Sequence, residues 1–317
     1  MSALKLKTRG ELWLAAGMRR FYATFARRLE QGPAPDFRSH DIGPAAPVLV
    51  STPIPRIIWA YWNGDSVPLL IQRCFDNWAR LNPGYSLRIL NDAQLPQYVP
   101  QLPGNLQQLP VAKRSDWLRL ELLHRHGGIW LDASTILTEP LDWLLEQQQR
   151  SGADLVAYYL ERYTRDLQVP VVENWLMAAP PGSAFIAALH KEYVEQVLPQ
   201  TGEAYIAQLQ QAGDYEQLRQ GIDMPAYLSM HLAMQRVLRA GGSYRLRLAK
   251  AEDGPFFLHV QGNWGRTPLK IRLMVSRTEL APVPLIKLRA PDRKKLDFYL
   301  ERGLYVPGSI ADRYLRG

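Results

Sequence analysis

The segment that most constrains this 317-residue chain spans residues 114–138 and reads RSDWLRLELLHRHGGIWLDASTILT. Its apolar residues predict a largely buried helix over residues 115–126. The glycine pair at 127–128 ends that helix, because glycine adopts the left-handed C-cap geometry at little cost. The apolar run 129–131 then predicts a buried strand with Asp132 at its carboxyl end. An open α/β sheet commonly presents ligand-binding groups at this edge.

The polar side chains of this segment are predicted to converge. Asp116 and Arg119 are three residues apart and share one helix face, with Ser115 predicted as the N-cap. The glycine pair turns the chain back, which brings Asp132 toward that face, and Ser134 follows two residues later. Carboxylates bind sugar hydroxyls and divalent metals, and a guanidinium offers a fork of donors. The set suits a sugar that carries a diphosphate. A surface ion pair beside a strand-end turn is the open alternative.

The sequence SDWLRLELLHRHGGIWLDAST resembles the DXD-containing sugar-binding region of a group of glycosyltransferases. This group includes yeast-type α-mannosyltransferases, the glucosylating domains of large clostridial toxins and bacterial capsular polysaccharide synthesis proteins. The form WLDAS is most similar to the capsular branch, and the resemblance extends over residues 54–264. It implies an α/β fold of the GT-A type, with a mixed central sheet flanked by helices. It also implies retaining transfer of a sugar from a nucleotide-diphosphate donor to a saccharide or lipid-linked saccharide acceptor, in capsular or other surface polysaccharide synthesis.

The resemblance assigns donor-binding roles to several residues. Asp116 and Arg119 would hold the donor sugar, and Trp62, next to the turn residues Asn-Gly, would stack on the base. Asp132 would bind the ribose or a divalent metal, Mn²⁺ or Mg²⁺, together with Ser134. Because Ser134 replaces the second carboxylate of DXD, and a neutral hydroxyl is a weaker ligand for a hard cation, the metal requirement is left open.

Two further segments complete the predicted site. Residues 169–179 read VPVVENWLMAA and resemble the segment that faces the donor sugar and the acceptor, so Glu173 and Asn174 are predicted to be catalytic with Asp132. A strand-edge ion pair is the alternative for Glu173. In residues 256–264, His259 and Trp264 match a pattern in which a metal ligand precedes a tryptophan that closes over the sugar diphosphate. Imidazole is an acceptable Mn²⁺ ligand. The alternative is that His259 is a structural residue at the end of an apolar strand and binds no metal.

The remaining pattern is consistent with a nucleotide-sugar fold. Residues 57–61 predict a first buried strand, residues 67–81 a helix, and residues 85–90 a second strand. This β-α-β order lacks the G-x-G-x-x-G of dinucleotide-binding proteins.

The charges divide the chain into three parts. Residues 1–50 hold eight Lys and Arg against four Asp and Glu, residues 51–235 hold 13 against 19, and residues 236–317 hold 17 against seven. A slightly acidic middle is not typical of a nucleic-acid-binding core, so no nucleic acid partner is expected. The predicted domains are a basic N-terminal helix with a proline-rich linker over residues 1–50, a transferase domain over 51–285, and a basic tail over 286–317.

Composition and the basic ends suggest a cellular location. The single Cys74 fits a reducing compartment, and no run approaches the roughly 20 apolar residues of a membrane span. We therefore expect a cytoplasmic protein whose basic helix at residues 4–29 lies on the anionic inner face of the membrane. Packing of that helix on its own domain is the alternative. A non-catalytic sugar-binding or membrane-associated scaffold subunit of a polysaccharide assembly complex is the other open class. The donor sugar, base, acceptor and linkage are not determined by sequence.

Overall fold

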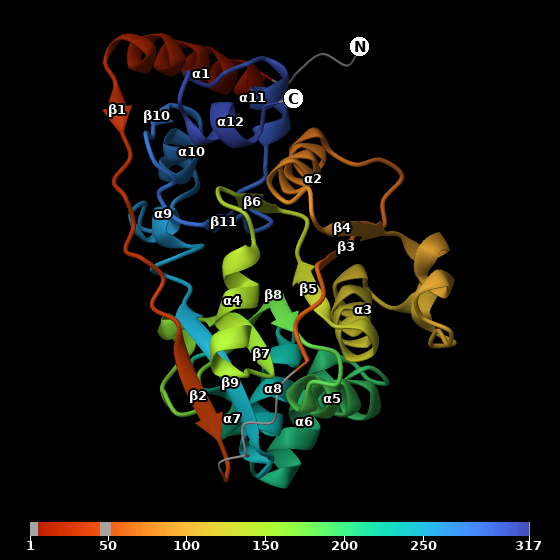
Figure 1. Ribbon diagram of the computed structural model, residues 1–317. Helices are drawn as coiled ribbons and strands as arrows, with labels where there is room; N and C mark the ends of the chain where they lie inside the picture. Colours follow the sequence, from red (N-terminus) through yellow and green to blue (C-terminus); the bar gives the residue numbers. More distant parts are fainter. Residues whose placement is uncertain (1–5, 45–51, 317) are drawn as a thin grey trace.

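A seven-stranded mixed sheet runs through the middle of the computed structural model, which describes residues 6–44 and 52–316 (Figure 1). The strand order is β2-β9-β7-β8-β5-β3-β4. Strand β3 pairs in parallel with β4 and β5, and β7 with β9, whereas the other pairs are antiparallel. The strands are β2 Arg38–Ile42, β3 Ile57–Tyr61, β4 Ser86–Leu90, β5 Gly128–Leu131, β7 Leu155–Tyr159, β8 Val172–Ala179 and β9 Tyr244–Lys250. The expected α/β fold with a mixed central sheet is confirmed.

Helices cover both faces of the sheet and form one hydrophobic core on each. Along β3, Ile58 and Ala60 point into one core, whereas Trp59 and Tyr61 point into the other, as the two-residue repeat of a strand requires. The first core is covered by α2 Leu69–Leu81, α4 Asp142–Ser151, α10 Arg266–Met274, α11 Leu296–Glu301 and α12 Ile310–Tyr314. The second is covered by α3 Val111–His126, α5 Ala184–Glu192, α6 Gly202–Ala212, α7 Tyr215–Arg219 and α8 Ser229–Arg239.

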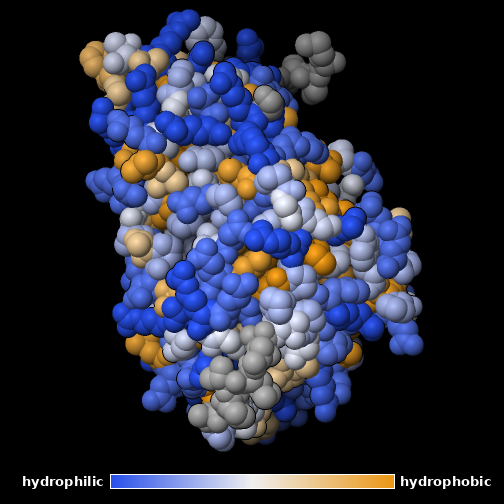
Figure 2. Space-filling model, viewed as in Figure 1, coloured by the Kyte–Doolittle hydropathy of each residue, from blue (hydrophilic) through white to orange (hydrophobic). Residues whose placement is uncertain are grey.

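Short elements complete the described chain. Two small sheets pair β1 with β10 in parallel and β6 with β11 in antiparallel fashion. Their strands are β1 Arg27–Arg28, β6 Thr135–Leu137, β10 Ser276–Arg277 and β11 Leu285–Lys287. The remaining helical segments are α1 Leu6–Thr24, η1 Asp92–Gln97, η2 Leu106–Gln108, η3 Glu161–Tyr163, η4 Tyr193–Val197 and α9 Phe257–Val260. On the face shown in Figure 2, hydrophilic residues predominate and hydrophobic ones lie in separate groups.

Two local predictions are wrong in detail. The helix expected from Ser115 begins four residues earlier, at Val111, and follows Pro110. Proline at a helix start is favoured because its missing N–H would have no intrahelical acceptor there. The segment expected to be a strand before His259 is instead the short helix α9.

The two ends of the chain are integrated into the fold more closely than the sequence suggested. The proline-rich linker expected within residues 1–50 contributes β2, which forms an edge of the central sheet, whereas residues 1–5 and 45–51 lie outside the described residues. The expected tail packs into the first core through α11 and α12. Figure 1 shows α1 beside these helices, and Arg19 of α1 donates to the Tyr305 carbonyl at 3.2 Å.

The glycine pair between α3 and β5 sets the position of the segment that follows. Gly127 and Gly128 have φ angles of 63° and 105°, which side chains disfavour. A Cβ atom on Gly128 would lie 2.9 Å from the Ile57 carbonyl oxygen of the neighbouring strand. Only glycine allows β5 to turn out of α3 and pair with β3 at this distance.

We expect Gly128→Ala to lower the free energy of unfolding by roughly 2 kcal/mol or more, because both the backbone angle and the contact with Ile57 are unfavourable. Urea denaturation followed by circular dichroism measures this change. The control is Gly84→Ala, where the added Cβ has no neighbour within 4 Å. Its effect should stay within about 0.5 kcal/mol. Equal unfolding midpoints for the two variants would contradict the role given to Gly128.

Candidate active site

The candidate site lies at the edge of the sheet where β3, β4 and β5 end. Asp132 follows β5 directly, and Trp62 follows β3, which pairs in parallel with β5. Strand β8 runs antiparallel to β5, so Glu173 and Asn174 near its start reach the same edge. The Asp132 amide donates to the carbonyl of Trp175 on β8 at 2.9 Å, which joins the two strands at this point. The sheet therefore gathers these predicted residues at one edge.

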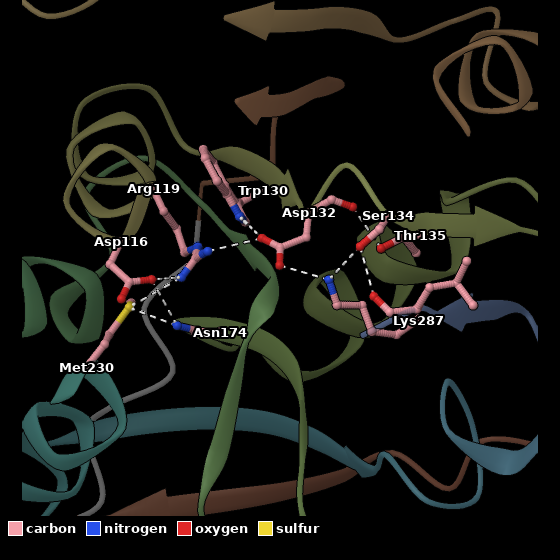
Figure 3. A network of polar contacts seen from close by, with 10 residues as sticks. Asp116, Arg119, Trp130, Asp132, Ser134, Thr135, Asn174, Met230 and Lys287 are labelled. Atoms are coloured by element: carbon pink, nitrogen blue, oxygen red, sulfur yellow. Dashed lines mark hydrogen bonds and ion pairs between the residues drawn. The ribbon is translucent and has the colours of Figure 1, made fainter. Parts of the chain in front are cut away.

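Arg119 links the two carboxylates that the sequence predicted to converge. Its Nη1 donates to Asp116 Oδ1 at 2.6 Å and its Nη2 to Asp132 Oδ1 at 3.1 Å (Figure 3). Trp130 supports the arrangement twice. Its indole Nε1 donates to Asp132 Oδ1 at 3.1 Å, and the guanidinium carbon of Arg119 lies 4.9 Å from its ring centroid. The predicted grouping of Asp116, Arg119 and Asp132 is present.

The two carboxylates have different electrostatic environments. Burial raises the pKa of Asp116 to about 6, although Arg119 opposes the shift. Burial also disfavours ionisation of Asp132, but the cations Lys287 and Arg119 outweigh it and lower the pKa of this carboxyl. The Asp132 side chain keeps 31% of its exposure, whereas that of Arg119 keeps 3%. Asp132 is thus an ionised acid that is accessible from solvent.

Lys287 is the second cation bound to Asp132, and it comes from β11. Its Nζ lies 2.8 Å from Asp132 Oδ2 and 3.4 Å from Ser134 Oγ. The pairing of β11 with β6 places Lys287 opposite Thr135. Ser134 Oγ donates to the carbonyl of Leu288 at 2.8 Å, which closes the network drawn in Figure 3.

The arrangement does not fit a divalent metal. A divalent cation would share oxygen ligands from Asp132 and Ser134, but the Lys287 ammonium already lies between these two side chains. The Ser134 hydroxyl directs its hydrogen to a backbone carbonyl. Within residues 6–44 and 52–316, no three His, Cys, Asp or Glu side chains come together to hold a metal.

Asn174 and Glu173 occupy different parts of the site. Asn174 Nδ2 donates to Asp116 Oδ1 at 3.1 Å, so this amide helps to fix the Asp116 carboxylate. Glu173 is buried, and burial raises the pKa of its carboxyl to about 8, against the opposing charge of Lys287. Glu173 therefore keeps its proton at neutral pH and can donate a hydrogen bond.

Trp62 is half-buried at the end of β3, and its indole Nε1 donates to the Ser66 carbonyl at 3.2 Å. Beside it is a polar network that sequence reasoning missed. Asp92, at the end of β4, accepts from Tyr61 Oη at 2.5 Å, from Asn63 Nδ2 at 2.9 Å and from Arg114 Nη1 at 2.5 Å. Asp92 comes two residues after a predicted strand, and this position is the sequence feature that could have identified it as a site residue.

His259 does not join Asp132 and Ser134. Its Nε2 lies 3.0 Å from Asp292 Oδ2, and both side chains are fully buried. No hydrogen bond or ion pair connects His259 with Asp132 or Ser134 in the part of the chain that the structure describes. The predicted convergence of the three metal ligands is not present, because the Asp292 carboxylate engages the imidazole instead.

Trp264 lies in an unusual backbone segment that arginines hold. Asn263 and Trp264 have φ angles of 47° and 57°, a left-handed conformation that is rare for such residues. The guanidinium carbons of Arg162 and Arg289 lie 4.8 and 5.1 Å from the Trp264 ring centroid. Arg289 also donates to the Trp264 carbonyl at 3.2 Å and binds Asp292.

The basic residues of the site escaped sequence reasoning. Lys287 and Arg289 were assigned to a basic tail, because nothing in their local sequence separates them from the other cations there. Lys287 is 155 positions from Asp132 along the chain. Only the pairing of β11 with β6 brings the two together.

Comparison with known proteins gives relatives for part of the chain. It is 25% identical over 162 residues to the candidate glycosyltransferase HOC1 of Saccharomyces cerevisiae, which covers 45% of this chain and 40% of HOC1. It is 27% identical over 121 residues to the initiation-specific alpha-1,6-mannosyltransferase of Candida albicans, which covers 32% of this chain and 31% of that protein. The chain thus matches two fifths or less of these relatives' length. The expected resemblance to yeast-type mannosyltransferases is confirmed.

Solved structures show weaker similarity. An active-site mutant of LgtC matches with a TM-score of 0.39 and 12% identity, over 78% of this chain and 93% of LgtC. The PaToxG glycosyltransferase matches with a TM-score of 0.32 and 15% identity, over 75% of this chain and 97% of that one.

A family profile also matches the chain. The profile of the capsular polysaccharide synthesis protein family matches residues 49–207, half of the chain. The matched range contains Trp62, Asp116, Arg119 and Asp132, and it ends before Lys287. The chain belongs to the capsular polysaccharide synthesis protein family.

Proposed function

We propose that this protein is a glycosyltransferase that moves a sugar from a nucleotide-diphosphate donor to a hydroxyl of a saccharide or lipid-linked saccharide. The product would belong to a capsular or other surface polysaccharide. The observation that carries the proposal is the pair of carboxylates, Asp116 and Asp132, that Arg119 holds together at the carboxyl edge of the sheet. Membership of the capsular polysaccharide synthesis protein family and the names of the relatives support it.

The donor sugar would bind at Asp116. Its Oδ1 accepts from Arg119 and Asn174, whereas Oδ2 has no hydrogen-bond partner among residues 6–44 and 52–316. The fixed Oδ1 orients the carboxylate, so Oδ2 is free to accept a hydroxyl of the sugar. Hydrogen bonds to an ionised acceptor are the stronger kind. Trp62 would stack on the base, and Trp264, with its two arginines, would lie over the sugar diphosphate.

In the reaction, the bond between the sugar C1 and the diphosphate oxygen breaks, and C1 bonds to the acceptor oxygen. The hydroxyl proton of the acceptor passes to the departing nucleoside diphosphate, which leaves with the electron pair of the broken bond. Asp132, Glu173 and Asn174 surround this centre in the proposal, and neutral Glu173 would donate a hydrogen bond to a sugar or acceptor oxygen. Retention at C1 rests on the resemblance alone. The expected Mn²⁺ or Mg²⁺ stays a prediction. The residues as arranged do not fit a divalent cation, so no step of the proposed reaction depends on one.

We also propose a cytoplasmic protein that lies on the anionic inner face of the membrane through α1. Among the described residues, no helix is long and apolar enough to cross a bilayer. Met18 and Tyr22 of α1 pack on the core, whereas Trp13 and Phe21 are 80% and 55% exposed. The exposed face also carries Arg20. A helix face that combines arginine with aromatic residues is typical of interfacial binding.

The donor site can be tested by thermal shift with a panel of UDP-, GDP-, dTDP- and CMP-sugars, with and without Mn²⁺. A bound donor should raise the melting temperature of the full chain. Asp116→Asn should weaken binding of that donor about 10- to 100-fold, because a charge-assisted hydrogen bond to the sugar is lost. The matched control is Asp76→Asn on the exposed side of α2.

If no nucleotide sugar in the panel stabilises the protein under either condition, the proposed activity is wrong. If a donor binds but no sugar is transferred to any saccharide acceptor offered, the protein is a sugar-binding subunit instead.

The pKa of Glu173 predicts a pH dependence. Its folded value of about 8 exceeds the ordinary value of 4.5, so the folded state holds this proton more tightly. The stabilisation is complete below about pH 4.5 and is lost as the pH rises toward 8, with a slope on the order of 1 kcal/mol per unit. We expect Glu173→Gln to remove this part of the decline in unfolding free energy. Exposed Glu195→Gln is the control, and parallel profiles for wild type and Glu173→Gln would refute the assignment.

Membrane binding can be measured by sedimentation of the full chain with vesicles of phosphatidylglycerol and phosphatidylcholine. The double variant Trp13→Ser and Phe21→Ser should lower the partition coefficient about tenfold, since two aromatic side chains no longer enter the interface. Leu167→Ser, at a position 62% exposed away from α1, is the control. Equal partition of all three proteins would exclude α1 as the binding surface.

A further inference from the structure

We propose that the Lys287 ammonium performs the role that a divalent cation was expected to have, and that it holds the donor diphosphate without a metal. This inference rests on the proposed function, because it concerns the donor of the same reaction. It identifies a binding residue that lies outside the range matched by the family profile.

The backbone fixes the position of Lys287. Its amide donates to the Pro255 carbonyl at 3.1 Å, and the amide of Leu288 donates to the Ser134 carbonyl at 2.9 Å. The Ser134 hydroxyl returns a hydrogen bond to the Leu288 carbonyl at 2.8 Å. Strand β11 pairs with β6 on one side and bonds to Pro255 on the other, so the backbone position from which the Lys287 side chain extends is fixed.

The ammonium occupies the space between the two side chains that correspond to the DXD pattern. Nζ lies 2.8 Å from Asp132 Oδ2 and 3.4 Å from Ser134 Oγ, and 5.6 Å from the ring centroid of Trp175. The Lys287 side chain is 10% exposed, against 31% for Asp132. Figure 3 shows the lysine head directed at both oxygens from the opposite strand.

A lysine in this position supplies what a diphosphate needs. The ammonium has three N–H donors, and Asp132 and Ser134 account for two of them. The third can donate to a phosphate oxygen that approaches from the solvent side of Asp132. Serine in place of the second carboxylate agrees with this role, because one negative charge is sufficient to balance one ammonium, whereas a divalent ion would need more.

The neighbouring residue of the same segment extends the positive surface. Arg289, two positions after Lys287, contacts Trp264 and Asp292. The guanidinium of Arg162 reaches the same ring, whereas the backbone amide of this residue donates to the Glu252 carboxylate at 3.1 Å. A diphosphate between Lys287 and Trp264 would therefore meet cations at both ends.

The experiment measures binding of UDP and GDP to the full chain by calorimetry, in EDTA and in 1 mM Mn²⁺. We expect the Kd of the bound diphosphate to agree within about twofold between the two conditions. Lys287→Gln should raise this Kd about 10- to 100-fold, whereas Lys287→Arg, which keeps the charge, should restore most of the affinity. Exposed Lys191→Gln is the control for loss of a lysine.

A second readout separates a direct contact from a structural effect. Binding of uridine or guanosine, which lack phosphates, should be unchanged in Lys287→Gln when followed by saturation-transfer NMR. Binding of UDP and GDP only in Mn²⁺ would overturn the inference and leave the proposed function intact, and this comparison needs no variant. An unchanged diphosphate Kd in Lys287→Gln would also overturn it. If neither nucleoside diphosphates nor nucleotide sugars bind in any condition, the proposed function itself fails.

Discussion

The carboxylate of Asp132 joins the α3–β5 segment to the distant strand β11. It accepts from Arg119 of α3 on one oxygen and from Lys287 of β11 on the other, while its own backbone continues from β5. An ionised acid at this depth is tolerated because both cations are bound to it, and each cation is tolerated because the acid is there. Removing one member would leave uncompensated charge beside the sheet. The position of the candidate site therefore depends on this network as much as on the strands.

Much of the fold follows from local sequence. The elements around the site have short-range signals in the sequence. These are the apolar run before Asp132, the glycine pair whose backbone conformation other residues disfavour, and the β-α-β order of residues 57–90. The Asp116 and Arg119 contact was predictable because residues three apart share a helix face. Asp132 was predictable as the third residue of this group because the glycine pair turns the chain back toward the helix face that carries Asp116 and Arg119.

The errors have a common physical origin in contacts between distant segments. A five-residue strand within a proline-rich segment, β2, forms only because β9 offers a free edge some 200 residues later. Helices α11 and α12 have few distinguishing features in sequence, and they are ordered by the core that they cover. The pairing of β11 with β6 is likewise invisible in sequence, so Lys287 resembled any other basic residue near the end of the chain. His259 was misplaced because the buried partner that holds it, Asp292, lies 33 positions away.

The residues of the candidate site also fall into those that local sequence identified and those that only the structure identified. The residues that sequence identified are mainly acids and amides from the range matched by the family profile, and they suit the hydroxyls of a sugar. The residues that only the structure identified include the cations Lys287 and Arg289, which suit phosphates. Under the proposed function, a sugar diphosphate would lie across both sets, with Asp132 at their meeting point. Asp132 would then act on the donor indirectly, by keeping Arg119 and Lys287 in place on either side of the bond that breaks. The two halves come from different parts of the chain. The charge that meets the diphosphate can therefore change by substitution in β11, while the sugar-binding half stays constant.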